Sequence, residues 1–295
     1  MIGVFIPMAA GAQTVATASP TGVEVFPDAG LFAPLLADPY DPAFRQRFVY
    51  GTGDGNPTVT MLGITEQGGR FGLVRWRAGK GTVQVEIAGS VSAQFDLGAT
   101  HWDLLNTDYT IGFPITYRRG PTGLRLRAYH QSSHLGDEFV RRDNIWIWGD
   151  PDPILPTDTG YHASYRFEAI ELLASHEWRG WRGYVGGEWR WFVAPWFLEP
   201  WVARGGLEHR ARLREGERMA TDLVGAVDVR MTQNRDWAPG VSVRSGVEIG
   251  RLEREGRPGR RVGILAEYFN GPAPFGQFQM MYDLRYYGGG FYIYW

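Results

Sequence analysis

The chain has 295 residues, no cysteine and a formal net charge of −2 at pH 7. Without cysteine it has no disulfides, thiolate metal sites or cysteine nucleophiles. The near balance of charge gives no reason to expect a nucleic-acid partner, because that binding needs an excess of basic residues. The 40 glycines, 12 tryptophans, 14 tyrosines and 16 phenylalanines accompany a mean hydropathy of −0.26. An aromatic chain that is not hydrophobic on average favours alternating strands over buried helices.

The first residues, MIGVFIPMAAGAQ, form an apolar run that ends in the small residues Ala10-Gly11-Ala12. This pattern is typical of a signal-peptidase site, so we expect residues 1–12 to be a partial signal peptide and the protein to be exported. A basic start is missing, so either the true start lies upstream or the signal is incomplete. Residues 13–57 are rich in proline, alanine and aspartate without a sustained period, which predicts an irregular N-terminal segment.

From residue 58 onward, apolar and polar residues alternate. The clearest run is TVQVEIAGSVSAQFDL, residues 82–97, and a period of two over such a length predicts a strand longer than those of most soluble sheets. No later apolar run of about eighteen residues predicts a transmembrane helix. Similar alternation predicts about twelve strands, near residues 58–65, 70–78, 82–97, 106–118, 122–134, 165–178, 181–194, 200–213, 220–233, 240–251, 261–270 and 284–295.

The polar faces of these strands are crowded with Arg, Glu and Asp, whereas the apolar faces carry Trp and Tyr near the strand ends. Membrane interfaces favour such aromatic residues. The chain closes on Trp295, with Ile293 and Phe291 on the same face, which resembles the terminal signal that the barrel-assembly machinery reads in bacterial outer-membrane barrels. The sequence therefore predicts an all-β protein: an antiparallel transmembrane β-barrel of about 12 strands over residues 58–295, located in the bacterial outer membrane.

The predicted partners of this barrel are outer-membrane lipids, and its oligomeric state does not follow from the sequence. A barrel of about twelve strands is narrow, and lumenal Arg and Glu side chains of both signs can pair across it. We therefore expect a plugged or tight lumen rather than an open pore.

The stretch Tyr129–Glu138, YHQSSHLGDE, carries the densest group of potentially reactive side chains in the chain. It begins within the predicted strand 122–134, whose apolar residues occupy even positions. The even face of a barrel strand with this pattern meets lipid. Continuing the period places three polar residues on that face, at the outer end of the strand before loop 135–164: His130, Ser132 and His134. Polar groups there must find partners or sit at the headgroup level.

His130 and Ser132 form a His-x-Ser motif that resembles the lipid-facing sites of outer-membrane phospholipase A and the lipid A deacylases. The phospholipase has Asn-Gly after its serine, whereas this chain has Ser133-His134. The resemblance implies an acyl hydrolase in which Ser132 is the nucleophile and His130 the base, with a third polar group that orients the imidazole. The candidates for that group are Asp137, Glu138 and Glu168. No cofactor is required.

Two other interpretations of the motif remain open. In the first, the polar side chains form a structural network that ties the end of the strand to loop 135–164, with Gly136 making a turn and Asp137 capping the next segment. The barrel is then a non-catalytic structural protein or a narrow channel for small solutes. In the second, His130, His134 and Asp137 or Glu138 bind a divalent metal. Two histidines four residues apart on a strand lie roughly 13 Å apart, so this site needs a bulge or turn.

Five segments together resemble the domain-of-unknown-function 1207 family of bacterial envelope proteins. The resemblance implies an envelope location and supplies no activity. The segments are LFAPLLADPYDPAF at 31–44, AQFDL at 93–97, LLNTDYTIGFPITYRRG at 104–120, YHQSSHLGDEF at 129–139 and FGQF at 275–278.

Overall fold

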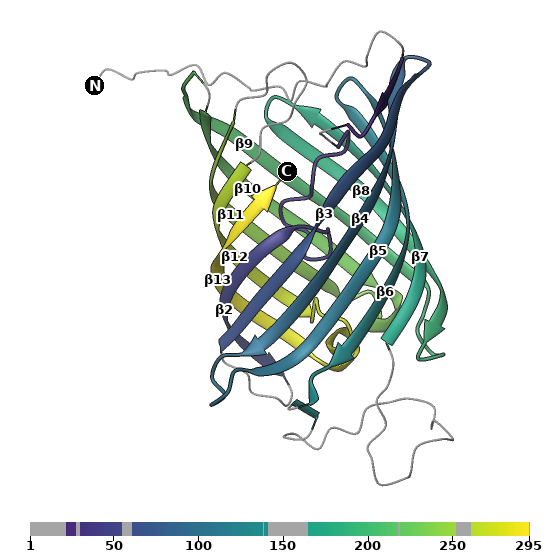
Figure 1. Cartoon of the computed structure of the whole chain (residues 1–295). Helices are drawn as coiled ribbons and strands as arrows, with labels where there is room; N and C mark the ends of the chain where they lie inside the picture. Colours follow the sequence, from purple (N-terminus) through teal and green to yellow (C-terminus); the bar gives the residue numbers. More distant parts are fainter. Residues whose placement is uncertain are drawn as a thin grey trace, which may run out of the picture.

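The computed structural model describes residues 22–27, 30–54, 61–137, 139–140, 165–217, 219–251 and 261–294. Twelve long antiparallel strands in these ranges, β2 to β13, pair with their neighbours in the chain, and β13 pairs with β2 to close a barrel (Figure 1). The predicted fold class is therefore confirmed. The strands are β2 Phe44–Asp54, β3 Met61–Ala78, β4 Gly81–Asp96, β5 Asp103–Arg119, β6 Thr122–Leu135, β7 Tyr165–Trp178, β8 Trp181–Ala194, β9 Trp201–Glu215, β10 Met219–Thr232, β11 Pro239–Arg251, β12 Arg261–Pro272 and β13 Asp283–Tyr294.

Three further short elements have bounds within the described ranges: β1 (Val23–Val25), the 3-10 helix η1 (Gln233–Arg235) and helix α2 (Phe278–Met281). Neither of these helices is long and apolar enough to cross a membrane. The connections β3–β4, β5–β6, β7–β8 and β9–β10 are short and lie at one end of the barrel, here called the turn end. The connections β4–β5, β8–β9, β10–β11 and β12–β13 lie at the opposite end, the loop end, together with the last residues of β6 and the first residues of β7 (Figure 1).

The start of the barrel differs from the prediction in two ways. β2 begins at Phe44, inside the segment 13–57 that was expected to be irregular, and the predicted strands 58–65 and 70–78 are one strand, β3. The predicted break covered residues 66–69, which include Gly68 and Gly69, but β3 continues through them. A Cβ at Gly68 would overlap the Ser90 side chain on β4, so this glycine permits close pairing rather than ending the strand. The predicted number of strands is right because the two errors compensate.

The two faces of the sheet meet different surroundings. The outer face carries a band of exposed large apolar side chains, as in membrane-spanning barrels. It includes Phe48, Ile111, Phe113, Ile115, Leu124, Leu126, Ile170, Leu172, Val185, Leu207, Leu223, Val247, Ile249, Ile264 and Phe291. The inner face buries charged side chains of both signs, among them Arg45, Glu86, Arg125, Glu171, Glu188, Arg204, Arg244 and Glu267. The alternation predicted from the sequence thus separates an apolar outer face from a charged lumen.

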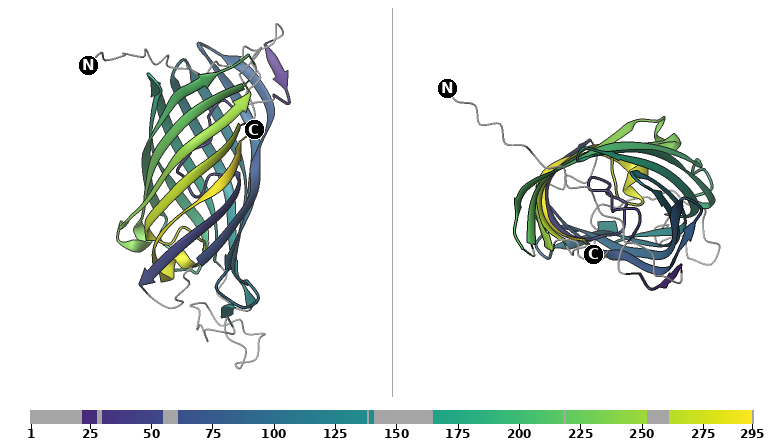
Figure 2. Two further views of the ribbon diagram at one scale, coloured as in Figure 1. Left: turned by 90° about the vertical axis from the view of Figure 1, so that its left-hand side faces the viewer. Right: turned by 90° about the horizontal axis from the view of Figure 1, so that it is seen from above.

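Residues 30–43, here called the plug, lie inside the ring of strands, as the dark purple trace in the right-hand view of Figure 2 shows. β1 and β2 pair with the same edge of β3, because β4 occupies the other edge along its length. The chain between them turns into the lumen. Asp38 and Asp41 of the plug are fully buried there.

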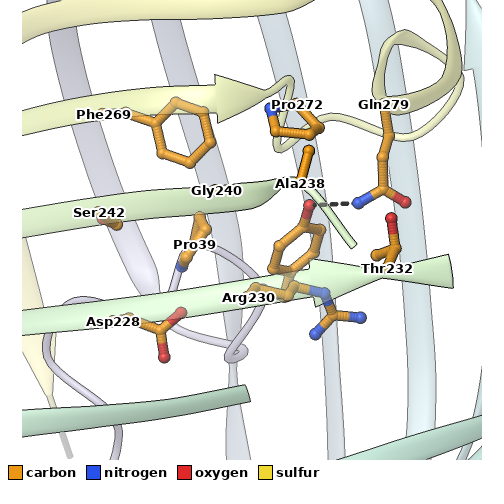
Figure 3. A pocket seen from close by; sticks show the side chains of 11 residues that line it. Pro39, Asp228, Arg230, Thr232, Ala238, Gly240, Ser242, Phe269, Pro272 and Gln279 are labelled. Carbon is orange, nitrogen blue, oxygen red and sulfur yellow. Dashed lines mark hydrogen bonds between the residues drawn. The ribbon is translucent and has the colours of Figure 1, made fainter. Parts of the chain in front are cut away.

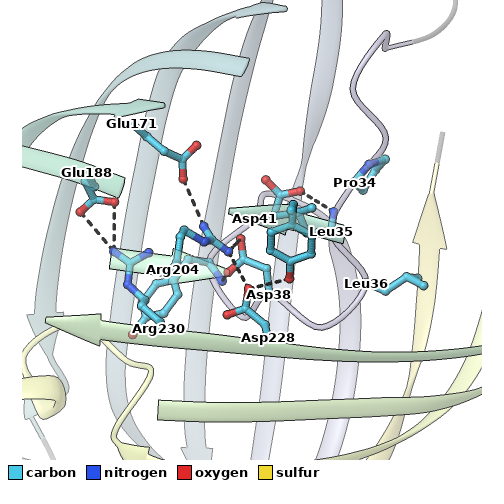
Figure 4. Close-up of polar contacts among 12 residues, drawn as sticks. Pro34, Leu35, Leu36, Asp38, Asp41, Glu171, Glu188, Arg204, Asp228 and Arg230 are labelled. Atoms are coloured by element: carbon cyan, nitrogen blue, oxygen red, sulfur yellow. Dashed lines mark hydrogen bonds and ion pairs between the residues drawn. The ribbon is translucent and has the colours of Figure 1, made fainter. Parts of the chain in front are cut away.

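Ion pairs fix the plug to several strands (Figure 4). Asp38 pairs with Arg204 at 2.6 Å, and Asp41 pairs with Arg125 at 2.8 Å and also with Arg70. Burial alone would raise the pKa of the Asp41 carboxyl, but the guanidinium groups of Arg125 and Arg70 outweigh burial and hold that pKa well below its ordinary range. Because Asp38 and Asp41 each pair with arginines of the wall, the plug lowers the cost of burying those arginines.

A second segment, residues 273–282 between β12 and β13, also folds into the lumen and is here called the inner loop. Its Gln279 amide donates to the Tyr40 hydroxyl of the plug at 2.9 Å, so the two inserted segments touch. A cavity of about 10 Å³ remains beside Tyr40, between Arg230, Thr232 and Gln279 (Figure 3). This is the space of about one water molecule. The plug and the inner loop thus occupy the part of the lumen that the described residues enclose, where the sequence predicts a plugged or tight lumen.

Candidate functional site

The residues of YHQSSHLGDE divide between the two faces of β6. Tyr129, Gln131 and Ser133 point into the lumen and are buried. His130, Ser132 and His134 lie on the outer face, as the sequence predicts. The strand reaches the loop end at Leu135, so these three side chains lie near the rim of the apolar band.

The lumenal half of the motif holds the inner loop. The Ser133 hydroxyl donates to Asn106 Oδ1 at 2.8 Å and accepts a hydrogen bond from the Gln277 backbone at 3.3 Å. Asp108 on β5 accepts from the Gly276 backbone at 3.1 Å. Asn106 and Asp108 belong to the segment 104–120, Ser133 to 129–139, and Gly276 and Gln277 to 275–278. Three of the five segments that resemble the family therefore meet at one place in the lumen.

The glycines of this region are required by close packing. The Gly136 N–H donates to Leu105 O at 2.9 Å, and a Cβ at Gly136 would overlap Leu104 O. A Cβ at Gly276 would overlap both the Ser133 hydroxyl and the Asp108 carboxylate. The structural network expected for the motif is thus present on its lumenal side, where it ties β6 to β5 and the inner loop. The predicted tie to loop 135–164 lies largely outside the described residues.

On the outer half, His130 bonds to a residue of the neighbouring strand. Glu168 on β7 lies directly opposite His130, and the His130 Nδ1 to Glu168 Oε1 distance is 2.8 Å. Both side chains are 38% exposed, so the pair is open to the outer surface. When Nδ1–H donates to the carboxylate, the neutral ring keeps Nε2 free to accept a proton. Of the two candidate orienting groups that the structure describes, Asp137 and Glu168, it is Glu168 that lies beside His130.

Ser132 lies two residues further along β6 on the same face. It is half-buried and lies opposite Tyr109 on β5 and Arg166 on β7. Alternate residues of a strand are about 7 Å apart, and no hydrogen bond joins His130 to Ser132 among those of the described residues. The two groups share a surface but are not in contact in this state.

The other candidate residues do not join this pair. Asp137 is exposed beyond the end of β6 and is not bonded to His130, and Glu138 lies outside the described residues. The His134 ring packs edge-on against Tyr109, with centroids 5.9 Å apart. Within the described ranges, no three His, Asp or Glu side chains converge as metal ligands. The geometry therefore gives no support to a metal site built on His130, His134 and Asp137.

Aromatic side chains border the outer polar patch, here defined as His130, Ser132, His134, Arg166 and Glu168. Trp191 of β8 lies opposite Glu168, and its ring stacks on Trp189 at 5.2 Å. Phe192 and Trp196 nearby are 80% and 74% exposed. Nothing in the sequence singles out Arg166, because it is the second residue of β7, directly after the long loop, where no alternation precedes it. Its register opposite Ser132 appears only once β6 and β7 are paired.

Two solved barrels are similar to this chain. The β domain of the Bordetella autotransporter BrkA is 15% identical with a TM-score of 0.41, and the match covers 86% of this chain and 98% of that domain. The outer membrane phospholipase A of Escherichia coli is 11% identical with a TM-score of 0.49, and the match covers 87% of this chain and 93% of the phospholipase.

A family described as "Protein of unknown function (DUF1207)" matches residues 8–294. No curated protein sequence matches the chain.

Proposed function

Because the chain belongs to the DUF1207 family, whose description assigns no activity, we propose a function from the geometry of the outer polar patch: hydrolysis of acyl esters of envelope lipids at the outer surface of the barrel. The observation that carries the proposal is the 2.8 Å bond between His130 Nδ1 and Glu168 Oε1 beside Ser132. A carboxylate-held histidine next to a serine, on a surface that meets lipid, has the components of an acyl-transfer site.

The proposed setting is the bacterial outer membrane, with its lipids as partners and the barrel-assembly machinery as the inserting system. The outward apolar band supports this setting, and so do the exposed tryptophans at both of its ends. Trp178 and Trp181 lie at the turn end, and Trp196 and Trp201 at the loop end. The predicted signal peptide and the terminal Trp295 lie outside the described residues.

In the proposed reaction the Ser132 hydroxyl attacks the ester carbonyl while His130 Nε2 takes its proton. The Ser132 Oγ–carbon bond forms, the ester carbon–oxygen bond breaks, and the imidazolium gives its proton to the leaving alcohol. Water then cleaves the acyl-serine and releases the fatty acid. Glu168 holds the ring tautomer and stabilises the imidazolium. The missing contact between serine and histidine forms with substrate bound, because catalytic hydrogen bonds are often long in the free enzyme.

Release of fatty acid from phospholipid or lipopolysaccharide by the purified barrel tests the proposal. We expect Ser132→Ala and His130→Ala to lower turnover by about a thousandfold or more, and Glu168→Gln by a smaller factor, while each variant remains a folded, heat-modifiable barrel. The matched control is His176→Ala. His176 is another outward histidine of the β6–β7 pair, bonded to the Thr122 hydroxyl at 3.0 Å at the turn end. Wild-type turnover in both Ser132→Ala and His130→Ala would disprove the proposal.

The rival function is a non-catalytic structural role, in which His130 and Glu168 only bridge β6 and β7. The lumenal contacts of Ser133 and Gln277 favour this rival for the other half of the motif. Absence of fatty-acid release by the wild-type protein with both lipid classes would leave this structural role as the better account.

A further inference from the structure

Arg166 is the cation of the outer polar patch. It lies directly opposite Ser132 in the β6–β7 register, and its other neighbour, on β8, is Ala194. Its side chain is exposed, whereas Tyr165 and Phe167 on either side of it point into the lumen and are buried. Arg166 therefore belongs to the same outward face as Ser132 rather than to the charged lumen.

The position of Arg166 along β7 matches the headgroup level of a lipid. β7 runs from the loop end to the turn end, so Arg166 lies about 7 Å nearer the loop end than Glu168. The exposed aromatic residues Phe192 and Trp196 lie on the adjacent strand and connection. Such residues mark the boundary between acyl chains and headgroups. The His130–Glu168 pair therefore lies on the acyl side of Arg166.

Among the residues that the structure describes, no carboxylate pairs with Arg166, which leaves its guanidinium available to a ligand. Glu168, the next acidic residue along β7, bonds to His130 at 2.8 Å. Ala194 opposite has no polar side chain. An arginine presents a planar fork of N–H donors that fits phosphate oxygens in a bidentate manner. At the headgroup level of a membrane, the anions within reach are the phosphates of lipids.

We propose that Arg166 binds the phosphate of a lipid headgroup and so selects phosphate-bearing lipids over neutral acylglycerols. This inference rests on the proposed function, since it names the substrate class of the same patch. In this arrangement the phosphate lies at Arg166, and the ester of the same lipid lies toward Ser132 and His130. Arg166 acts as a specificity-determining residue and takes no part in proton transfer.

Lipid retention tests the inference separately from turnover. The Ser132→Ala barrel is equilibrated in mixed micelles with phosphatidylglycerol and with diacylglycerol of the same acyl chains, and the bound lipid is measured by native mass spectrometry. We expect it to retain phosphatidylglycerol in preference, and the added Arg166→Gln change to weaken that retention by about tenfold. Arg285→Gln is the matched control, because Arg285 is an exposed arginine at the loop end on β13, outside the patch. It should leave retention unchanged.

Two further measurements complete the test. Excess inorganic phosphate should not displace the phospholipid, since the site recognises phosphate on a lipid; displacement would indicate a free-anion site and overturn the inference. In the active protein, Arg166→Gln should raise KM for phosphatidylglycerol by a larger factor than it lowers kcat. Equal retention by the Arg166→Gln and Arg285→Gln variants would show that Arg166 is only an interfacial anchor and would also overturn it. The retention measurement tests phosphate binding at Arg166 even if the protein hydrolyses no lipid. Failure of the inference can therefore be distinguished from failure of the proposed function.

Discussion

Ser132 and Ser133 are adjacent serines that lie on opposite faces of β6. Ser132 lies on the outer face beside Arg166, whereas Ser133 is buried in the lumen and holds the inner loop. The period of two in the sequence predicts this difference, because successive side chains of a strand point to opposite faces. The lumenal half of the YHQSSHLGDE motif therefore has a structural role, although it carries potentially reactive groups.

The choice of Glu168 as the partner of His130 could not be made from the sequence. Glu168 is 38 residues from His130 and on the far side of the long β6–β7 connection. Only the register of β6 against β7 brings the two side chains together. A shift by one residue would turn Glu168 into the lumen.

Gly276 gives a prediction at the scale of one residue. Gly276→Ala places a Cβ against Ser133 and Asp108, so we expect the inner loop to be displaced from its packing site on β5 and β6. The free energy of unfolding should fall by about 1–3 kcal/mol. The expected signs are faster proteolysis within residues 273–282 and a lower temperature of heat modification. Gly225→Ala is the control, because the nearest atom to its Cβ is Ser245 Oγ at 3.9 Å. Unchanged proteolysis of the Gly276→Ala variant would contradict the packing argument.

At the scale of elements, periodicity predicts most strands well and the first one poorly. β4 to β13 were predicted to within a few residues because each has several alternations in sequence. β2 was missed because its sequence, FRQRFVYGTGD, follows a proline-rich segment and carries Arg45 and Arg47 on its lumenal face. The plug could not be predicted, since an irregular segment has no period and its charges become informative only when the arginines of several strands surround it.

The plug gives a prediction at this scale. Asp41→Asn removes one partner of a buried pair and leaves Arg125 and Arg70 undercompensated, which typically costs about 3–5 kcal/mol. We expect the midpoint of heat modification to fall by on the order of 10 °C. Asp283→Asn makes the same chemical change in an exposed pair with Arg235 and should shift the midpoint by little. Equal midpoints for the two variants would show that the plug adds no stability.

The lowered pKa of Asp41 sets the direction of the pH dependence. Since the folded protein holds that pKa below its ordinary value, the stabilisation is present at neutral and mildly acidic pH. It is lost only as the pH falls through the folded value, below the ordinary value of about 3.9. The contribution of the Asp41 ion pairs to the free energy of unfolding should therefore be the same at pH 7 and pH 5.

At the scale of the whole molecule, two inserted segments occupy the lumen of the described barrel, and they determine the behaviour that we expect in a bilayer. The plug and the inner loop meet at Tyr40 and Gln279 and leave room for about one water molecule beside them. We expect the wild-type protein to give no stepwise current in planar bilayers at high salt. A variant in which residues 31–40 are replaced by a Gly-Ser segment of equal length should conduct. Stepwise current from the wild-type protein would contradict the filled lumen.

The plug also determines the charge balance of the barrel wall. Asp38 and Asp41 are carboxylates that belong to no strand, yet they neutralise arginines of β3, β6 and β9. A barrel without its plug would therefore present Arg70, Arg125 and Arg204 to water with fewer counter-charges than they have now. Rings of arginine favour the passage of anions. The plug thus occupies the place that mobile anions would take in an open barrel, as a set of counter-ions covalently joined to the wall they neutralise.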